Sequence, residues 1–551
     1  MTQVRNNKEQ TSLVKDQVAL PSRLHHLGQR IPASLVLGGV LFVVALGFDL
    51  YRLGNPSIWY DEAFSVELAR LPLPLLWHII SGPEPNMELY YLFLHFWLGL
   101  IGALGLHATE FVVRLPSAVF AALSTVAVFL LGRRFIGTIA GVAGASLYLL
   151  NDLQLVYAQQ TRAYSLQLLL ICIAWYALLS ALTTPSRRWW ACYIVATTLA
   201  VYAHLFSILI LLAQLVMFAG LLILPGERQN SLRRLPGLLV SLVITGVLII
   251  PMLLVSRNGS KTDWLPIPHL SDVYHLFLTI SASSKLYLLV IAACCAFGLL
   301  VVCLCYLPAG RDLLRHNALV DEKSARAMHN LLPIVLALVC WLVVPIVVSY
   351  IISYTPTRLF SSRYLVTTVP ALALLMGVGV GALRWRAVQV AVTVVLLLIA
   401  ICYVPLYYQS AQVEDWNATT HWLEQRYRAN DGMVCYSNLH GGCQISVEYY
   451  LHAYPGAAHF TADSPGAYSW TSFGPVDPGA GYDAAVDPQA LAAYGVKHPR
   501  LFFIVGRLPD ASSAAKARAA QQWLDSHYHL VDQIMTRTVT IRLYTTQSQT
   551  S

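Results

Sequence analysis

The chain has 551 residues, of which 57% are hydrophobic and only 12% are charged, and its formal net charge is +8. Soluble domains usually carry about a quarter charged residues, so this composition excludes an ordinary soluble protein and indicates that lipid solvates much of the chain. The basic residues lie in short clusters between apolar runs, which is typical of membrane topology and argues against a nucleic-acid partner.

Residues 1–32 form a charged leader before the first apolar run. No small-residue cleavage site follows that run, so we expect an uncleaved membrane anchor rather than a signal peptide. Apolar runs of about 20 residues, the length that a bilayer requires, then recur as far as Leu406. We predict about eleven membrane spans, at residues 33–51, 113–131, 138–151, 163–182, 189–203, 206–224, 236–255, 286–307, 330–352, 365–383 and 387–406.

The basic clusters fall in alternate loops between these spans, on the same side as the leader. Because cytoplasmic loops carry the excess of lysine and arginine, that side is predicted to be cytoplasmic. An odd number of spans then places residues 407–551 outside, so we expect a multi-pass protein of the cell inner (plasma) membrane. The clusters are Lys15, Arg23 and Arg30; Arg133 and Arg134; Arg187 and Arg188; Arg228, Arg233 and Arg234; Arg311, Arg315, Lys323 and Arg326; and Arg384 and Arg386.

One further apolar stretch, Met87–Leu104, is interpreted as a helix in the outer interface. Counting it as a span would invert every later loop and place the arginine clusters outside. Its tyrosine, histidine and tryptophan side chains also suit an interfacial position. The transmembrane domain is therefore predicted at residues 33–406, with its first outer loop at residues 54–112.

The first outer loop carries two adjacent carboxylates, Asp61 and Glu62, at the start of the amphipathic stretch Trp59–Arg70. Neighbouring residues of a helix point about 100° apart, so only one of the two can easily face a cavity at the membrane. The alternative is that both carboxylates complement the positive end of a helix dipole.

Three arginines, Arg162, Arg358 and Arg363, are predicted on the outer face, against the positive-inside bias. A guanidinium fork suits phosphate oxygens, and ionisable residues near a membrane favour a functional interpretation. The alternative is that these side chains snorkel to lipid headgroups.

His204 lies at a turn on the same face, and Glu84 precedes Tyr90 and Tyr91 in the first outer loop. A lone histidine at such a turn is more often a capping residue, and tyrosines are common at membrane interfaces. Together the outward residues describe a cavity with a carboxylate and several arginines, which suits a reaction on a lipid-linked phosphate. The chain has no Gly-rich phosphate loop, Walker pattern or dinucleotide fingerprint, which argues against a protein that is driven by a nucleotide.

The segment Leu53–Ala63 resembles the first-loop motif of bacterial membrane glycosyltransferases with the GT-C fold, relatives of protein O-mannosyltransferases and of the lipid A aminoarabinose transferase. Three positions depart from the family pattern: Asn86 and Met87 replace a proline pair, and Gln160 stands where a glutamate is common. The role of that glutamate in metal or acceptor binding is therefore in doubt here. Later segments match the family in order: Asn86–Tyr91, Arg114–Ser117, Leu131–Phe135, Gln159–Tyr164, Tyr202–His204, Ser362–Leu365 and Glu414–Trp416.

The resemblance implies an inverting glycosyltransferase that moves a sugar from a polyprenyl-phosphate donor to an unidentified acceptor. Asp61 is expected to act as general base on the acceptor hydroxyl, with Glu62 better suited to orienting the loop. A divalent cation near Asp61 stays an open prediction, because no ligand spacing requires one. The candidate residues are Asp61 and Glu62 for catalysis and, for substrate binding, Glu84, Tyr90, Tyr91, Gln160, Arg162, His204, Arg358 and Arg363.

The tail after residue 407 alternates helix and strand patterns and predicts a small extracytoplasmic α/β domain. Cys435 and Cys443 permit a local disulfide in an oxidising compartment, and the sequence leaves that pairing open. We expect strands near residues 433–436, 501–506, 529–535 and 539–545, a helix at residues 511–526 and loop at residues 465–488.

Two other functions stay open. A lipid-linked sugar flippase or secondary transporter usually shows internal repeats and broken spans near the midplane, whereas this chain shows no repeat and carries its charges at the outer rim. A structural or assembly factor of the cell envelope would leave the loop carboxylates and the outward arginines unexplained. The preferred hypothesis is a polytopic α-helical membrane protein that transfers a sugar.

Overall fold

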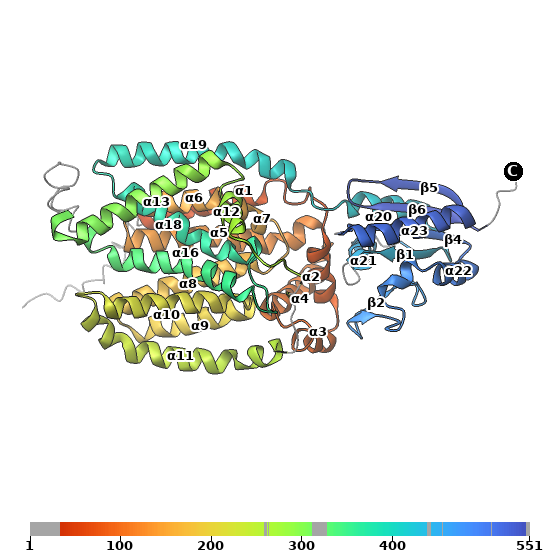
Figure 1. Ribbon diagram of the computed structural model, residues 1–551, viewed down its shortest axis with the longest axis horizontal. Coiled ribbons are helices and arrows are strands. Elements are labelled where there is room, and N and C mark those ends of the chain that lie inside the picture. The colour runs from red at the N-terminus through yellow and green to blue at the C-terminus, as the bar shows by residue number, and fades with distance from the viewer. Residues whose placement is uncertain are drawn as a thin grey trace, which may run out of the picture.

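A computed structural model describes residues 33–257, 262, 264–310, 328–437, 442–453, 456–508 and 510–546. The leader and the basic cluster between Arg311 and Arg326, both used to predict the topology, lie outside the described residues. A body of roughly parallel helices and a smaller C-terminal domain follow each other along the longest axis of the molecule (Figure 1).

Each of the eleven predicted spans corresponds to a helix or a helix pair. The helices of this body are α1 (Ala33–Leu50), α5 (Glu110–Phe135), α6 (Thr138–Leu149), α7 (Asp152–Ala158), α8 (Tyr164–Thr183), α9 (Arg187–Ala203), α10 (Ser207–Ile223), α11 (Arg228–Ser256), α12 (Leu270–Ile280), α13 (Lys285–Tyr306), α16 (Leu332–Ile352), α17 (Ser362–Leu365), the short 3₁₀ helix η1 (Val366–Thr368), α18 (Val369–Gly381) and α19 (Arg386–Ser410).

Within the described ranges, eight helices are long and apolar enough to cross a membrane, and nine if the bent pair α6–α7 is one span. The predicted number of about eleven is higher because α9 and α10 have only 17 residues each. At 1.5 Å per residue such a helix is about 25 Å long, slightly shorter than a hydrocarbon core of about 30 Å. The protein is a multi-pass helical membrane protein, as predicted.

Small residues allow the central helices to pack closely. A Cβ atom added to Gly132 of α5 would lie 2.5 Å from the Cα atom of Gly141 in α6, so the two backbones touch at this point. Close approach through small residues is a common way for membrane helices to associate. The chain then turns at Asn151, whose side chain accepts hydrogen bonds from the first backbone amides of α7. α7 is inclined by 63° to α6 and leads into the turn at residues 159–163.

The first outer loop is largely helical and consists of α2 (Tyr60–Arg70), α3 (Leu73–Ile80) and α4 (Glu88–Ala103). These helices lie at the end of the body that faces the C-terminal domain (Figure 1). The stretch predicted as an interfacial helix is α4, which has 16 residues and packs against α2, α3 and α9.

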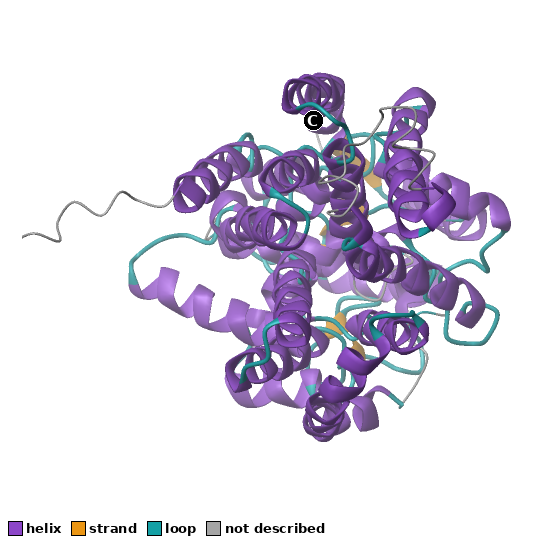
Figure 2. Ribbon diagram, turned by 90° about the vertical axis from the view of Figure 1, so that its left-hand side faces the viewer, coloured by secondary structure: helices purple, strands orange, loops and turns teal. Residues whose placement is uncertain are grey.

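The C-terminal domain has the predicted α/β composition. Its main sheet has the order β1-β4-β6-β5, with β1 parallel to β4 and the other neighbours antiparallel, and Cys435 and Cys443 form a disulfide. Viewed along the long axis, many helices of the body are seen nearly end-on, with the strands behind them (Figure 2). The elements are α20 (Trp416–Arg426), β1 (Gly432–Tyr436), α21 (Gly442–Ala453), β2 (Tyr468–Ser469), β3 (Gly474–Pro475), η2 (Tyr482–Val486), α22 (Pro488–Lys497), β4 (Arg500–Val505), α23 (Ala511–His527), β5 (His529–Met535) and β6 (Thr540–Thr545).

The C-terminal domain docks directly on the first outer loop. The Tyr450 hydroxyl lies 2.9 Å from the Ser57 hydroxyl and accepts a 2.8 Å hydrogen bond from the backbone N–H of Ile58. The Tyr449 hydroxyl donates to the carbonyl of Ala108 at 2.8 Å. One apolar cluster contains buried side chains from both parts, so burial and hydrogen bonds together hold the loop against the domain.

Candidate active site

Asp61 lies in the first turn of α2, between two arginines that are distant in the sequence. One carboxylate oxygen of Asp61 accepts a hydrogen bond from Nη1 of Arg363 at 3.1 Å. Nη1 of Arg162 donates to the backbone carbonyl of Asp61 at 3.1 Å and to the Ser65 hydroxyl at 3.0 Å. The Asp61 and Arg363 side chains keep 20% and 29% of their surface exposed. The structure therefore joins a carboxylate and two guanidinium groups at a place that a substrate can reach.

Two tryptophans flank the guanidinium group of Arg363. Its central carbon lies 6.0 Å from the ring centre of Trp59 and 5.3 Å from that of Trp264. Cations in this position are attracted by the negative face of an aromatic ring. Arg358 donates to the carbonyl of Leu265 at 2.5 Å and so holds the loop that carries Trp264.

Glu62 has a different environment from its neighbour, because its carboxylate is fully buried. Arg114 of α5 donates to both oxygens, from Nε at 2.8 Å and from Nη2 at 2.6 Å. The backbone N–H of Thr161 donates to the same carboxylate at 2.7 Å. Glu62 is enclosed by these donors and cannot touch a substrate, so it is placed to fix the loop and the turn on either side of Asp61.

Arg114 is a site residue to which the sequence assigned no role. Its guanidinium group also donates to three carbonyls of the first outer loop, those of Leu53, Pro56 and Ser57, at 2.7 to 3.1 Å. A single arginine in an otherwise apolar span needs a partner, and this signal could have identified it. Arg114 ties the start of the first outer loop to Glu62.

His204 is buried next to both arginines of the site. Its ring packs between Tyr164 and Tyr364, at centroid distances of 5.4 and 5.2 Å. Burial, followed by the charges of Arg162 and Arg363, lowers the pKa of His204 to about 3. The neutral ring accepts a hydrogen bond at Nδ1 from the backbone N–H of Phe206, which leaves the proton on Nε2.

The remaining candidates lie around this centre. Tyr91 is fully buried, and the Tyr90 hydroxyl lies 3.4 Å from that of Ser117. Glu84 is near enough for its charge to act on Arg162 and on Tyr91. Gln160 is half-buried, and its carbonyl accepts the backbone N–H of Arg162 at 2.8 Å.

Several buried polar atoms around Asp61 have no hydrogen-bond partner among the residues that the structure describes. A buried donor or acceptor without a partner costs about 1–3 kcal/mol, so such atoms are rare unless a ligand satisfies them. Five of them lie on residues that contact or neighbour Asp61, Arg162 or Arg363, where a polar ligand could satisfy them. The atoms are Nε1 of Trp59, the hydroxyls of Tyr91 and Thr161, Nε of Arg162 and Nε2 of His204.

The hydrogen-bond donors around Asp61 suit an anion better than a metal ion. No group of three or more histidine, cysteine, aspartate or glutamate side chains within the described ranges is arranged to hold a metal. The Asp61 carboxylate faces the guanidinium group of Arg363, and the five buried groups of the site without partners in the described ranges are mainly hydrogen-bond donors. A phosphate with hydroxyl-bearing neighbours matches this arrangement.

Comparisons with known proteins agree with the helical architecture. The family model described as dolichyl-phosphate-mannose-protein mannosyltransferase matches residues 91–255. The crystal structure of ArnT from Cupriavidus metallidurans in the apo state superimposes with a TM-score of 0.57 at 14% identity, covering 93% of this chain and 98% of ArnT. The structure of ArnT from the same organism bound to undecaprenyl phosphate gives a TM-score of 0.53 at 15% identity, with the same coverage. No curated protein matches the sequence.

At these identities the likeness to solved structures establishes the fold alone. It extends over nearly the whole of both chains and so includes the helical body and the C-terminal domain. The predicted GT-C fold is thereby confirmed, and the chain is similar to ArnT in fold.

Proposed function

We propose that this protein is an inverting glycosyltransferase that moves a sugar from a polyprenyl-phosphate donor to an envelope acceptor on the outer face of the cytoplasmic membrane. The observation that carries the proposal is the hydrogen bond of the Asp61 carboxylate with Arg363, next to Arg162, which donates to the backbone carbonyl of the same residue. Such a site can accept a proton at one point and stabilise a phosphate at another.

In the proposed reaction, Asp61 removes the proton from an acceptor hydroxyl as that oxygen attacks the anomeric carbon of the sugar. The bond between this carbon and the phosphate oxygen breaks, and the polyprenyl phosphate leaves with the electron pair. Arg162 and Arg363 stabilise the negative charge that grows on the leaving phosphate. Attack opposite the leaving group inverts the configuration of the sugar.

His204 adds a neutral hydrogen-bond donor to this site. Its Nε2–H is buried close to both arginines without a partner in the described part of the chain, and its low pKa keeps the ring uncharged at any physiological pH. A neutral donor can bind a phosphate oxygen or a sugar hydroxyl without competing with Asp61 for protons.

The comparisons support a lipid-phosphate donor. One similar structure is ArnT bound to undecaprenyl phosphate, and the matching family model is named for a dolichyl-phosphate sugar. The donor sugar is a hexose or a pentose, and the acceptor is a glycan, a lipid or a protein of the envelope. The arginine clusters of the cytoplasmic loops support the outward orientation of the site and of the C-terminal domain.

The proposal is tested with purified protein in vesicles that contain a radiolabelled polyprenyl-phosphate hexose and a mixture of envelope acceptors. Glycoside formation with an equal release of polyprenyl phosphate is the expected result. Movement of the intact sugar lipid between leaflets, without bond cleavage, would instead identify a flippase. Parallel reactions with a chelator and with added Mg²⁺ or Mn²⁺ decide whether the transfer needs a divalent cation.

A further inference from the structure

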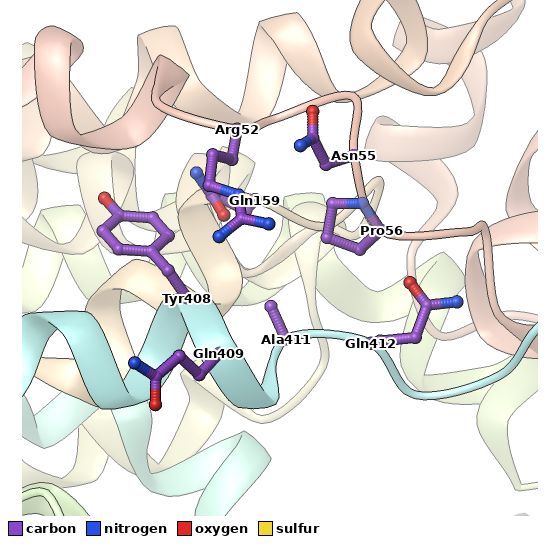
Figure 3. A pocket seen from close by; sticks show the side chains of 8 residues that line it. All are labelled: Arg52, Asn55, Pro56, Gln159, Tyr408, Gln409, Ala411 and Gln412. Atoms are coloured by element: carbon purple, nitrogen blue, oxygen red, sulfur yellow. The ribbon is translucent and has the colours of Figure 1, made fainter. Parts of the chain in front are cut away.

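A polar pocket lies beyond the C-terminal end of α1 (Figure 3). It has a volume of about 120 Å³, which is room for a group of the size of a phosphate. Its walls come from the turn after α1, the turn after α7 and the end of α19 with the linker that follows. The lining residues are Arg52, Asn55, Pro56, Gln159, Tyr408, Gln409, Ala411 and Gln412.

Arg52 supplies the charge of this pocket. Its guanidinium group points into the space next to Gln159 (Figure 3). The backbone of Arg52 has φ = 58°, a left-handed conformation that a long side chain rarely adopts. The turn is fixed by hydrogen bonds from the backbone N–H of Leu53 to Leu50 and from Asn55 to Arg52. Strained residues of this kind are often found where a ligand is held.

The floor of the pocket is already rigid. The amide nitrogen of Gln159 donates to the carbonyls of Asp49 and Tyr51 at 2.9 and 2.8 Å, and its oxygen accepts from the Tyr407 hydroxyl at 2.9 Å. The Tyr408 hydroxyl donates to the carbonyl of Phe48 at 2.6 Å. A ligand therefore meets a wall that does not need to rearrange.

Three residues of the pocket wall, at or after the ends of α1 and α19, carry side-chain amides, and two of these amides, on Asn55 and Gln409, are available to a ligand. Gln412 uses its nitrogen on the Glu414 carbonyl and the Asp415 carboxylate. The side chains of Asn55 and Gln409, by contrast, show no hydrogen bond to the residues that the structure describes, and both are exposed at the pocket. Arg52 offers positive charge and N–H donors to a bound anion, and the NH₂ groups of these two amides can add further donors.

The pocket opens where lipid headgroups lie. α1 and α19 both expose large apolar side chains along their length, and Tyr51, 57% exposed, stands at the outer end of α1. Exposed tyrosines of this kind mark the level of the headgroups, and lipid phosphates lie at the same depth. The exposed apolar residues include Val36, Val40, Val43 and Val44 of α1 and Val390, Val394, Val395 and Leu398 of α19.

We propose that this pocket binds the headgroup phosphate of an anionic membrane lipid, with Arg52 as the charged partner and the amides of Asn55 and Gln409 as hydrogen-bond donors. The pocket shares its walls with the loop that leads to Asp61. The backbone N–H of Ser57 donates to the side chain of Gln412 at 3.0 Å, and Arg114 holds the carbonyl of Pro56. A lipid at this place therefore braces the first outer loop against the linker to the C-terminal domain.

The test measures thermal unfolding of the purified full-length protein in neutral detergent. Phosphatidylglycerol in mixed micelles is expected to raise the unfolding midpoint of the wild type, because a ligand of the folded state stabilises it. Phosphatidylcholine should give a much smaller rise. Arg52→Gln should lose at least half of the rise, whereas the control Arg257→Gln, an exposed arginine at the outer end of α11, should keep it.

A second variant tests the pocket without changing the strained turn at Arg52. Gln409→Glu places a negative charge at the pocket rim on an exposed helix position, and it should also lose the rise. An undiminished rise in both variants would overturn the site. An equal rise from inorganic phosphate alone would overturn the assignment to a lipid. Because the readout is unfolding rather than sugar transfer, either result is independent of the proposed reaction.

Discussion

Asp61 and Glu62 are adjacent carboxylates with opposite environments, and the difference follows from helix geometry. Successive residues of α2 point about 100° apart, so one side chain reaches the exposed centre and the other enters the interior. Asp61 meets Arg363 at the edge of the protein, whereas Glu62 meets Arg114 in a fully buried pair. A buried ion pair is costly to break, because the remaining charge then lacks a partner.

Replacing Glu62 should therefore lower the stability of the fold, and any effect on the reaction should follow from that loss. Glu62→Gln leaves the Arg114 guanidinium group buried without a counter-charge, and we expect a loss of about 3–5 kcal/mol in the free energy of unfolding. Unfolding of the purified protein monitored by intrinsic fluorescence measures this change. The matched Asp61→Asn variant should unfold close to the wild type. Equal stability of Glu62→Gln and wild type would show that the pair does not hold the loop.

At the scale of elements, the β2–β3 hairpin of the C-terminal domain reaches the helix that carries Asp61. Trp470 and Phe473 pack on Phe64 at centroid distances of 5.4 and 6.2 Å. Phe64 follows Asp61 by three residues and so lies on the same side of α2. Phe473 has φ = 50°, which is rare for an aromatic residue. Under the proposed function, an acceptor bound at Asp61 would lie within reach of this hairpin.

We expect Trp470→Ala to weaken acceptor binding. Loss of one aromatic contact costs about 0.5–1.5 kcal/mol, which corresponds to a KM for the acceptor that is raised roughly two- to tenfold. Steady-state kinetics with the donor at saturation measures this effect, and the KM for the donor should stay unchanged. Trp385→Ala, at an exposed tryptophan before α19, is the control. A raised KM for the donor instead would place the hairpin at the lipid side.

The sequence predicts the elements of this fold well and their contacts poorly. Apolar runs identify the membrane helices, and the sidedness of the basic clusters brings Asp61, Arg162 and Arg363 to one face. Their hydrogen bonds, by contrast, join residues up to 302 positions apart. Neither the hydrophobic periodicity of a segment nor a cluster of charges in the sequence tells which distant residue a side chain will contact. For the same reason the apolar span around Arg114 could show that this arginine needs a partner, but not that the partner is Glu62. The 17-residue helices were counted as spans because hydropathy alone does not fix the ends of a helix.

At the scale of the whole molecule, two titratable residues of α21, His452 and Glu448, lie where the C-terminal domain docks on α2. Nδ1 of His452 lies 2.9 Å from a carboxylate oxygen of Glu67, which also pairs with Arg70 at 3.0 Å. The hydrogen bond to Glu67 raises the pKa of His452, and burial raises the pKa of Glu448 to about 7. In both cases the folded protein binds protons more tightly than the unfolded chain does.

Stability at this interface should therefore fall as the pH rises from about 5 to 8. The contribution of Glu448 is complete below its ordinary pKa of about 4.5 and is lost as the pH approaches 7, while that of His452 is lost as the pH passes its raised value. Hydrogen exchange of α21 amides at several pH values measures the docking. His452→Gln should flatten the profile, and His527→Gln, in α23, should not. If the pH dependence of hydrogen exchange is the same in His452→Gln as in the wild type, His452 is not its source.

The central claim is that Asp61 acts as the base in a reaction on a lipid phosphate, with Arg162 and Arg363 beside it. The most direct measurement is the single-turnover release of polyprenyl phosphate by the wild type, Asp61→Asn and the control Asp477→Asn, an exposed carboxylate of the C-terminal domain. We expect Asp61→Asn to slow the release by about 10²–10⁴-fold at unchanged unfolding temperature, and Asp477→Asn to behave as the wild type. Release by a correctly folded Asp61→Asn protein at the wild-type rate would contradict the account.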